Sequence, residues 1–266
     1  MTTSGKDVGT STPTITLAGG VEIPLIGFGT WQVTGHTGYE AVRLALESGY
    51  RHVDTATMYG NEAEVGRALR DSGLRREEVF VTTKLPPGRA GRERQTLTDS
   101  LRALGTDYVD LWLVHWPPAD EARPETWQEF LDAQRTGLAR AVGVSNYRIT
   151  QIDELVRATG QAPAVNQIPW SPSRFDARLL ADSRYRGVAV EGYSPFKGSD
   201  LRDPVLAEIA DAHGVTPAQV VLRWHVEHGV VAIPKSVTPE RIRSNLDVFS
   251  FALTPDEVAR IDRLGG

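Results

Sequence analysis

The chain has 266 residues, and its 40% hydrophobic and 24% charged content are those of an ordinary globular protein. The formal net charge of −5 offers no basic surface for a nucleic acid, and the arginines are interspersed with acidic residues rather than clustered. Because there are no cysteines, disulfides, thiolate metal sites and cysteine nucleophiles are all excluded.

The N-terminal segment and the hydropathy pattern favour a cytoplasmic protein. No apolar stretch approaches the roughly 20 residues that a membrane helix needs. Residues 1–12 are small and polar and lack the apolar core of a signal peptide, so we expect them to form a flexible tail.

Strand-like and helix-like segments alternate from residue 13 onwards. We expect a β-hairpin first, with strands at 14–17 and 21–23 joined by a turn at 18–20. Short β-branched or aromatic runs then predict strands at 26–29, 51–54, 79–84, 108–115, 141–145, 164–167, 188–193 and 230–234. Helices are predicted at 38–47, 62–72, 91–104, 124–136, 150–158, 176–183, 203–213, 217–227, 239–247 and 255–264.

Eight strands alternating with helices, with no linker between them, predict an α/β fold. We expect a single (β/α)8 TIM barrel domain over 13–266 with an N-terminal β-hairpin. A doubly wound dinucleotide-binding fold would need a glycine-rich turn after its first strand, and 27–32 (GFGTWQ) lacks the third glycine. Tyr193 and Lys197 have the spacing of short-chain dehydrogenases, but that pairing needs a helical turn and Pro195 lies inside it.

Four ionisable residues lie at or just beyond the C-terminal ends of the predicted strands. Asp54, Lys84 and His115 each end a strand, and Tyr59 follows Asp54 in a short loop. Catalytic residues of a parallel barrel gather at this end. Lysine is rare here, with four among the 29 Lys and Arg residues, yet Lys84 and Lys235 both lie at strand ends.

These four side chains suit proton transfer to a carbonyl group. Reduction of a carbonyl by hydride leaves an alkoxide, so a general acid is needed beside its oxygen. Tyr59 can supply the proton, but a phenol has a pKa near 10 that must be lowered to act at neutral pH. The Lys84 ammonium, bound by Asp54, is expected to lower it, while His115 orients the carbonyl through a ring N–H.

Each of the four residues also has an ordinary structural explanation. Asp54 alone fits a turn or cap residue, Tyr59 a half-buried aromatic, Lys84 a solvated side chain and His115 a structural histidine. The interpretation as a catalytic site therefore depends on all four occurring together at corresponding positions of one barrel.

Longer motifs in the same segments resemble the aldo-keto reductase superfamily, and among its members the bacterial 2,5-diketo-D-gluconate reductases. The motifs are 29–32 (GTWQ), 49–62 (GYRHVDTATMYGNE), 107–117 (DYVDLWLVHWP) and 233–241 (IPKSVTPER), and the similarity extends from about residue 14 to 264. The resemblance implies that Tyr59 is the general acid and that Asp54, Lys84 and His115 complete a catalytic tetrad.

The chain has no redox group of its own, so a nicotinamide cofactor is expected. The resemblance implies that Ser145, Asn146 and Gln167 bind its carboxamide and that Tyr193, next to Ser194, stacks on its ring. An alternative role for Ser145 and Asn146 is to cap the helix predicted at 150–158.

Positive charge near the helix at 239–247 indicates NADPH rather than NADH. Lys235, Ser236 and Arg241 surround the start of this helix, where backbone N–H groups favour a phosphate. Two cations and a hydroxyl suit the 2′-phosphate of NADPH better than a ribose hydroxyl. Asn245 is expected to contact the adenine.

Short loops at 85–90 and 197–200 predict an open, apolar substrate cleft. Trp31, Trp116 and Phe28 are expected to line it, with Trp170 as a further candidate, while the tryptophans at 112, 127 and 224 are expected to pack in the core. We therefore expect reduction of a broad range of small aldehydes and ketones, including dicarbonyls and keto-sugars.

Two other classes of protein fit the sequence less well than a reductase does. A non-catalytic barrel that senses nicotinamide or binds a partner does not need the complete tetrad. A metal-dependent hydrolase is disfavoured because the six histidines are scattered without a His-x-His pair, so no metal is expected. The expected protein is a monomer whose partner is a small carbonyl substrate, with no nucleic acid and no membrane.

Overall fold

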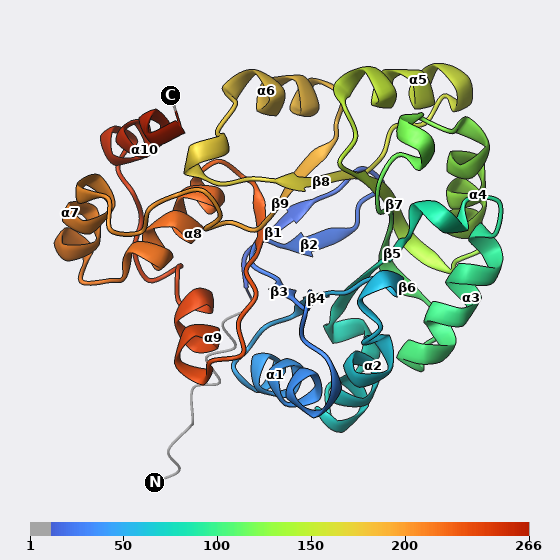
Figure 1. Cartoon of the computed structure of the whole chain (residues 1–266), viewed down its shortest axis with the longest axis horizontal. Helices are drawn as coiled ribbons and strands as arrows, with labels where there is room; N and C mark the ends of the chain where they lie inside the picture. Colours follow the sequence, from blue (N-terminus) through green and yellow to red (C-terminus); the bar gives the residue numbers. More distant parts are fainter. Residues whose placement is uncertain (1–11, 266) are drawn as a thin grey trace, which may run out of the picture.

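Eight parallel strands form a barrel with helices around it in the computed structural model, which describes residues 12–265 (Figure 1). The barrel strands are β3 (Phe28–Gly29), β4 (His52–Asp54), β5 (Phe80–Leu85), β6 (Val109–Val114), β7 (Ala139–Ser145), β8 (Val165–Pro169), β9 (Ala189–Tyr193) and β10 (Val231–Ile233). Each strand pairs with the next one in the chain. Backbone N–H groups of Gly27 and Gly29 donate to the carbonyls of Ala232 and Pro234, at 2.9 and 3.1 Å, and link the first strand to the last. The predicted (β/α)8 barrel is confirmed.

The helices form an outer ring around these strands (Figure 1). They are α1 (Gly35–Glu47), α2 (Glu62–Asp71), α3 (Glu93–Leu104), α4 (Pro124–Arg135), α5 (Ile149–Thr159), α6 (Ala177–Tyr185), α7 (Pro204–His213), α8 (Pro217–Glu227), α9 (Pro239–Leu246) and α10 (Pro255–Asp262). Their ends lie within three residues of the predicted ones. The sequence predicts N-cap hydroxyls at Thr216, Thr238 and Thr254, each of which precedes a proline. Thr216 and Thr254 accept a hydrogen bond from a backbone N–H of the first turn, whereas Thr238 precedes α9 without such a bond.

The predicted N-terminal hairpin is also present, and it covers the end of the barrel where the strands begin, here called the lower end. Its strands β1 (Thr14–Thr16) and β2 (Glu22–Pro24) pair in antiparallel register and lie in the centre of the view in Figure 1. Leu17, Val21 and Ile23 pack in one cluster with Phe80 and Val231, which belong to the interior of the barrel. Apolar packing therefore closes the barrel on the side where the strands begin.

The polarity of the barrel interior changes along each strand, and β5 shows this most clearly. Successive side chains of a strand point to opposite faces, so Phe80, Thr82 and Lys84 share one face. Phe80 packs with the apolar side chains of the hairpin, Thr82 contacts His52, and Lys84 contacts Asp54. The interior is thus apolar at the bottom and ionic at the top, where the strands end.

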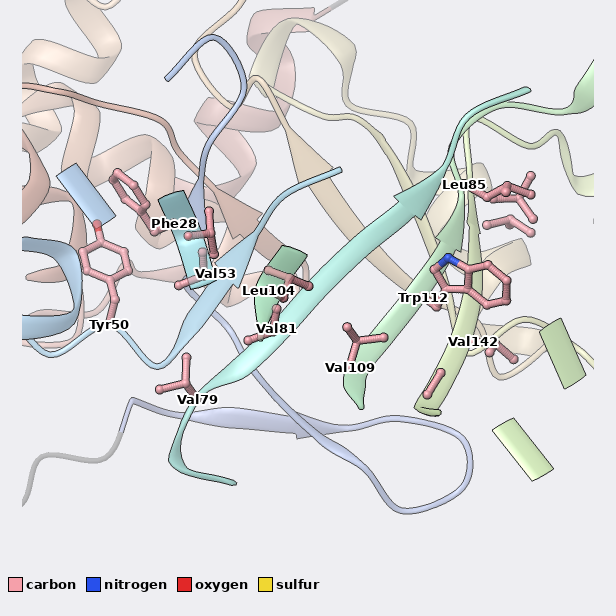
Figure 2. Packing of buried hydrophobic residues seen from close by; sticks show 14 of the residues in the cluster. Phe28, Tyr50, Val53, Val79, Val81, Leu85, Leu104, Val109, Trp112 and Val142 are labelled. Atoms are coloured by element: carbon pink, nitrogen blue, oxygen red, sulfur yellow. The ribbon is translucent and has the colours of Figure 1, made fainter. Parts of the chain in front are cut away.

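The opposite face of the strands packs against the helices. Figure 2 shows part of this cluster, with Val53, Val81 and Trp112 gathered along neighbouring strands. Trp112 stacks on Phe130 of α4 with ring centroids 3.6 Å apart, and Trp127 is fully buried beside them. The tryptophans at 112, 127 and 224 lie in the core as predicted. Their close packing makes the strands a rigid support for the residues at the strand ends.

The expected tail falls almost wholly outside the described residues, since these begin at residue 12. The assignment of 13–266 to a single domain stays a prediction. Within residues 12–265, none of the helices has the length and apolar character to cross a membrane.

The contact between α2 and α3 depends on a missing side chain at Gly66. A Cβ there would lie 2.3 Å from the backbone oxygen of Leu104. We therefore expect Gly66→Ala to lower the free energy of unfolding by about 1–3 kcal/mol, although alanine normally favours a helix. Urea denaturation measures this, with Gly88→Ala as control because a Cβ at Gly88 meets nothing within 4 Å. Equal stabilities of the two variants would contradict the close approach.

Candidate active site

A cleft of about 650 Å³ opens where the barrel strands end. It brings together eleven of the residues singled out from the sequence. These are Trp31, Asp54, Tyr59, His115, Trp116, Ser145, Asn146, Gln167, Tyr193, Ser194 and Lys235. Lys84 lies directly beneath them with no exposed surface.

Lys84 connects Asp54 to Tyr59. Its Nζ donates hydrogen bonds to Oδ1 of Asp54 at 2.6 Å and to the backbone oxygen of Thr55 at 2.9 Å, and it lies 3.4 Å from the Tyr59 hydroxyl. The three side chains come from β5, from β4 and from the one-turn helix η1 (Thr57–Tyr59) that follows β4. The arrangement predicted from the strand ends is therefore present in space.

Burial determines the protonation of this group as much as charge does. Burial by itself disfavours the Lys84 ammonium, but the charge and hydrogen bond of Asp54 and the nearby Tyr59 leave the pKa of Lys84 above its ordinary value. Burial also raises the pKa of Tyr59, and it outweighs the opposing effect of the Lys84 ammonium. The expectation that Lys84 brings the Tyr59 pKa below its ordinary value is thus wrong for this structure. Tyr59 keeps its proton at neutral pH.

His115 faces Tyr59 from the end of β6. The two rings meet edge to face with centroids 5.7 Å apart, and the His115 ring stacks on Trp116. Burial and the Lys84 charge lower the pKa of His115 to about 3, so the imidazole is neutral. A neutral imidazole has one N–H donor, which suits a carbonyl oxygen as its acceptor.

A second group of polar side chains lies beside His115, whose backbone oxygen accepts a hydrogen bond from Nδ2 of Asn146 at 3.1 Å. The Tyr193 hydroxyl donates to Oδ1 of Asn146 at 2.8 Å, and Nδ2 of Asn146 donates to Oγ of Ser145 at 3.0 Å. Asn146 and Ser194 follow the last residues of β7 and β9 and both have positive φ, at 63° and 54°. This left-handed backbone turns the chain sharply at the rim of the cleft.

The helix-cap alternative for Ser145 and Asn146 is wrong. Helix α5 begins at Ile149, and the residue before it, Arg148, donates its backbone N–H to the Gln151 side chain at 2.9 Å. The hydroxyl of Ser145 instead donates to the backbone oxygen of Gln167 at 2.8 Å. These side chains are therefore part of the cleft rather than of the helix end.

The residues expected to bind a 2′-phosphate and adenine are arranged along one segment. Lys235 is exposed and lines the cleft. Arg241 lies exposed in the first turn of α9, whereas Ser236 and Asn245 are buried. Ser236, Arg241 and Asn245 do not line the cleft itself, so any phosphate bound here lies outside the region of Tyr59.

Two aromatic residues expected in the pocket lie elsewhere. Phe28 is 1% exposed and packs edge to face on Tyr50, on the side of β3 that faces the helices. Trp170 is equally buried and packs between Phe175 and Trp224. The expectation that Phe28 and Trp170 line the cleft is wrong, and Met58, which is 58% exposed, lines it together with Trp31 and Trp116.

Sequence reasoning also missed a carboxyl group below the cleft. Glu191 of β9 is fully buried, with Oε1 3.6 Å from Nε2 of His52 and Oε2 2.9 Å from Nε2 of Gln167. The available signal was a carboxylate within the otherwise apolar run 188–193 (VAVEGY), two residues before Tyr193 and so on its face of the strand. Among residues 12–265, no three His, Asp or Glu side chains are grouped as a metal site would require.

Comparison with known proteins identifies the family. Residues 25–265 match the model of the Aldo/keto reductase family. The chain belongs to this family. Morphine 6-dehydrogenase of Pseudomonas putida is 45% identical, over 95% of this chain and 91% of the relative. The 2,5-diketo-D-gluconic acid reductase B of a Corynebacterium species is 43% identical, over 95% and 93%.

Solved structures of aldo-keto reductases have the same fold. One from Brucella melitensis superposes with a TM-score of 0.92 at 41% identity, covering 95% of this chain and 99% of the other. A Bombyx mori aldo-keto reductase in complex with NADP gives a TM-score of 0.89 at 37% identity, covering 96% and 93%. The chain is therefore an oxidoreductase that acts on carbonyl groups, as the four strand-end residues indicated.

The buried pair of Lys84 and Asp54 predicts a distinctive stability pattern. Removing one partner leaves an uncompensated buried charge, so Asp54→Asn is expected to lower the free energy of unfolding by about 3–5 kcal/mol. The double variant Asp54→Asn/Lys84→Met leaves no such charge and is expected to be more stable than Asp54→Asn alone. Urea denaturation checks the order of stabilities, with Asp99→Asn, which breaks an exposed pair with Arg102, as control. A double variant as unstable as the sum of the two single ones would contradict this coupling.

Proposed function

We propose that this chain reduces small aldehydes and ketones, dicarbonyls and keto-sugars among them, to alcohols with NADPH as cofactor and Tyr59 as proton donor. The observation that carries this is the position of the Lys84 ammonium, bound to Asp54 at 2.6 Å and 3.4 Å from the Tyr59 hydroxyl. Burial keeps the proton on Tyr59 until a reacting group accepts it, and the Lys84 ammonium then offsets part of the cost of the phenolate that forms beside it.

The side chains around the Tyr59 hydroxyl each have a separate role in proton transfer. A carbonyl oxygen bound between Tyr59 and His115 receives a hydrogen bond from each and is thereby polarised. Tyr59 then transfers its proton to the oxygen as negative charge develops there. Lys84 compensates the charge left on Tyr59, and Asp54 keeps the ammonium in place, with both Lys84 and Asp54 buried.

The polar groups at the ends of β7, β8 and β9 fit the carboxamide of a nicotinamide. Ser145, Asn146 and Gln167 offer amide and hydroxyl groups at the bottom of the cleft, and Tyr193 offers an aromatic ring beside them. When bound there, NADPH supplies the hydride that the chain itself cannot provide. Lys235 and Arg241 provide the positive charge that its additional phosphate needs.

The cleft walls favour a broad range of small substrates. Trp31, Met58 and Trp116 are 56%, 58% and 41% exposed and form an apolar rim of the cleft. Such a rim contacts the apolar parts of many carbonyl compounds and selects weakly among them. The named functions of the relatives are correspondingly varied: one from Escherichia coli is a methylglyoxal reductase, and one from Saccharomyces cerevisiae is a glycerol 2-dehydrogenase (NADP(+)).

We also propose that the enzyme works as a cytoplasmic monomer. The absence of cysteine and the net charge of −5 agree with a reducing compartment and with good solubility.

Replacing the proton donor tests the mechanism directly. Tyr59→Phe removes the hydroxyl and keeps the ring, so we expect turnover of a small aldehyde to fall by about 10²- to 10⁴-fold. NADPH affinity, measured by fluorescence titration, is expected to stay unchanged. Tyr185→Phe changes a tyrosine that is 89% exposed and serves as the matched control. Normal turnover of Tyr59→Phe would rule out this residue as the donor.

The cofactor preference depends on Arg241. A charge-assisted hydrogen bond to a phosphate contributes about 1.5–3 kcal/mol, so Arg241→Gln is expected to raise the Kd for NADPH roughly tenfold or more. The Kd for NADH, which lacks the 2′-phosphate, is expected to change little. Arg243→Gln on the same helix is the control, since Arg243 lies in its last turn. Equal losses of NADH and NADPH affinity in Arg241→Gln would argue against a phosphate contact.

A further inference from the structure

Beneath the cleft, the side-chain amide of Gln167 is bound between two carboxyl groups. Its Nε2 donates to Oδ2 of Asp54 at 2.8 Å and to Oε2 of Glu191 at 2.9 Å. The bond to Asp54 crosses the interior of the barrel, because β4 and β8 are four strands apart. Gln167 is 2% exposed and Glu191 is fully buried, so water does not compete for these contacts.

The two carboxyl groups determine which atom of the amide is free. Asp54 is an acceptor only, since its other oxygen binds the Lys84 ammonium, and the atom of Gln167 that faces it is therefore the nitrogen. Both hydrogens of that nitrogen are used on the two carboxyl groups. The remaining group of Gln167, which lines the cleft, is its oxygen.

The surroundings of Glu191 favour its neutral form. The titratable groups that face it are Asp54 and His52 of β4, Lys84 of β5, and Tyr59, and Tyr193 lies two residues further along its own strand. Burial and the charge of Asp54 raise the pKa of Glu191 to about 8, and burial lowers the pKa of His52 to about 3. At neutral pH, the group is thus a carboxylic acid beside a neutral imidazole, and it still accepts from Gln167 through Oε2.

We propose that Glu191 is a positioning residue for carbonyl reduction: together with Asp54 it orients Gln167 so that the amide oxygen, and not the nitrogen, faces the cleft. An oxygen in that position accepts a hydrogen bond from the amino group of a nicotinamide carboxamide. Asp54 then serves both sides of the site, since it binds Lys84 through one oxygen and Gln167 through the other. The inference rests on the proposed function, because it assumes that a nicotinamide binds here.

A double-mutant cycle on cofactor binding tests this role. Glu191→Leu removes the acceptor, and the loss of one buried hydrogen bond corresponds to a rise of about fivefold in the Kd for NADPH. In a Gln167→Leu background, the same change is expected to have no further effect, since Glu191 acts only through Gln167. Glu191→Gln keeps an oxygen for Gln167 and is expected to bind NADPH within about twofold of the wild type. Fluorescence titration gives each Kd without turnover.

Several outcomes would overturn the inference. One is a Glu191→Leu enzyme that binds NADPH as well as the wild type does, and another is an effect of Glu191→Leu that is equally large with and without Gln167. A wild type that binds NADPH but reduces no carbonyl contradicts the proposed function and leaves the cycle valid. A wild type that does not bind NADPH overturns both.

The pH dependence of stability provides a second measurement, which does not require Glu191→Leu to fold. Between pH 4.5 and about 8 the unfolded chain has released the Glu191 proton while the folded chain retains it, so this group loses stability as the pH rises through that window. Glu191→Gln has no such proton. The ratio of the wild-type to the Glu191→Gln unfolding constant is therefore expected to rise up to tenfold per pH unit in urea denaturation. A ratio that stays constant from pH 5 to 8 would show that Glu191 is not enclosed beneath Gln167, and would overturn the inference.

Discussion

The structure depends on a positive charge placed where water cannot reach it. Lys84 has no exposed surface, and an ammonium in such a place is tolerated only with a close counter-ion. Asp54 provides the counter-ion, and its second oxygen then needs a donor of its own, which is Gln167 on the opposite side of the barrel. The buried ammonium of Lys84 thus fixes side chains from β4, β5 and β8. The Tyr59 hydroxyl lies 3.4 Å from the ammonium, and Tyr59 lines the cleft.

The barrel and the four strand-end residues could be predicted because both depend on local patterns. A run such as 79–84 (VFVTTK) is recognisable as a strand, and the C-terminal ends of parallel strands meet at one end of the barrel whatever the loops do. The inward or outward face of a strand that is buried on both sides is not recorded in its hydrophobicity. For this reason the sequence favours Phe28 in the cleft, although its ring packs edge to face on Tyr50 in the core.

Properties that arise from contacts distant in sequence could not be predicted. Asp54 and Gln167 are 113 positions apart, and Glu191 joins them only because β8 and β9 are neighbours in the sheet. The pKa of Tyr59 is a balance between burial and the Lys84 charge, and its sign depends on how completely the loops cover the hydroxyl. Such balances belong to the assembled barrel and are absent from any single segment.

The hairpin formed by β1 and β2 affects how reactants bind to the site and leave it. Within residues 12–265, Leu17, Val21 and Ile23 pack into the end of the barrel where the strands begin, and the cleft opens at the end where they stop. Two reactants that share a one-ended cavity must arrive and depart by the same path. If the proposed function holds, the reactant that lies deeper is expected to enter first and leave last, because the packed lower end leaves it no second way out.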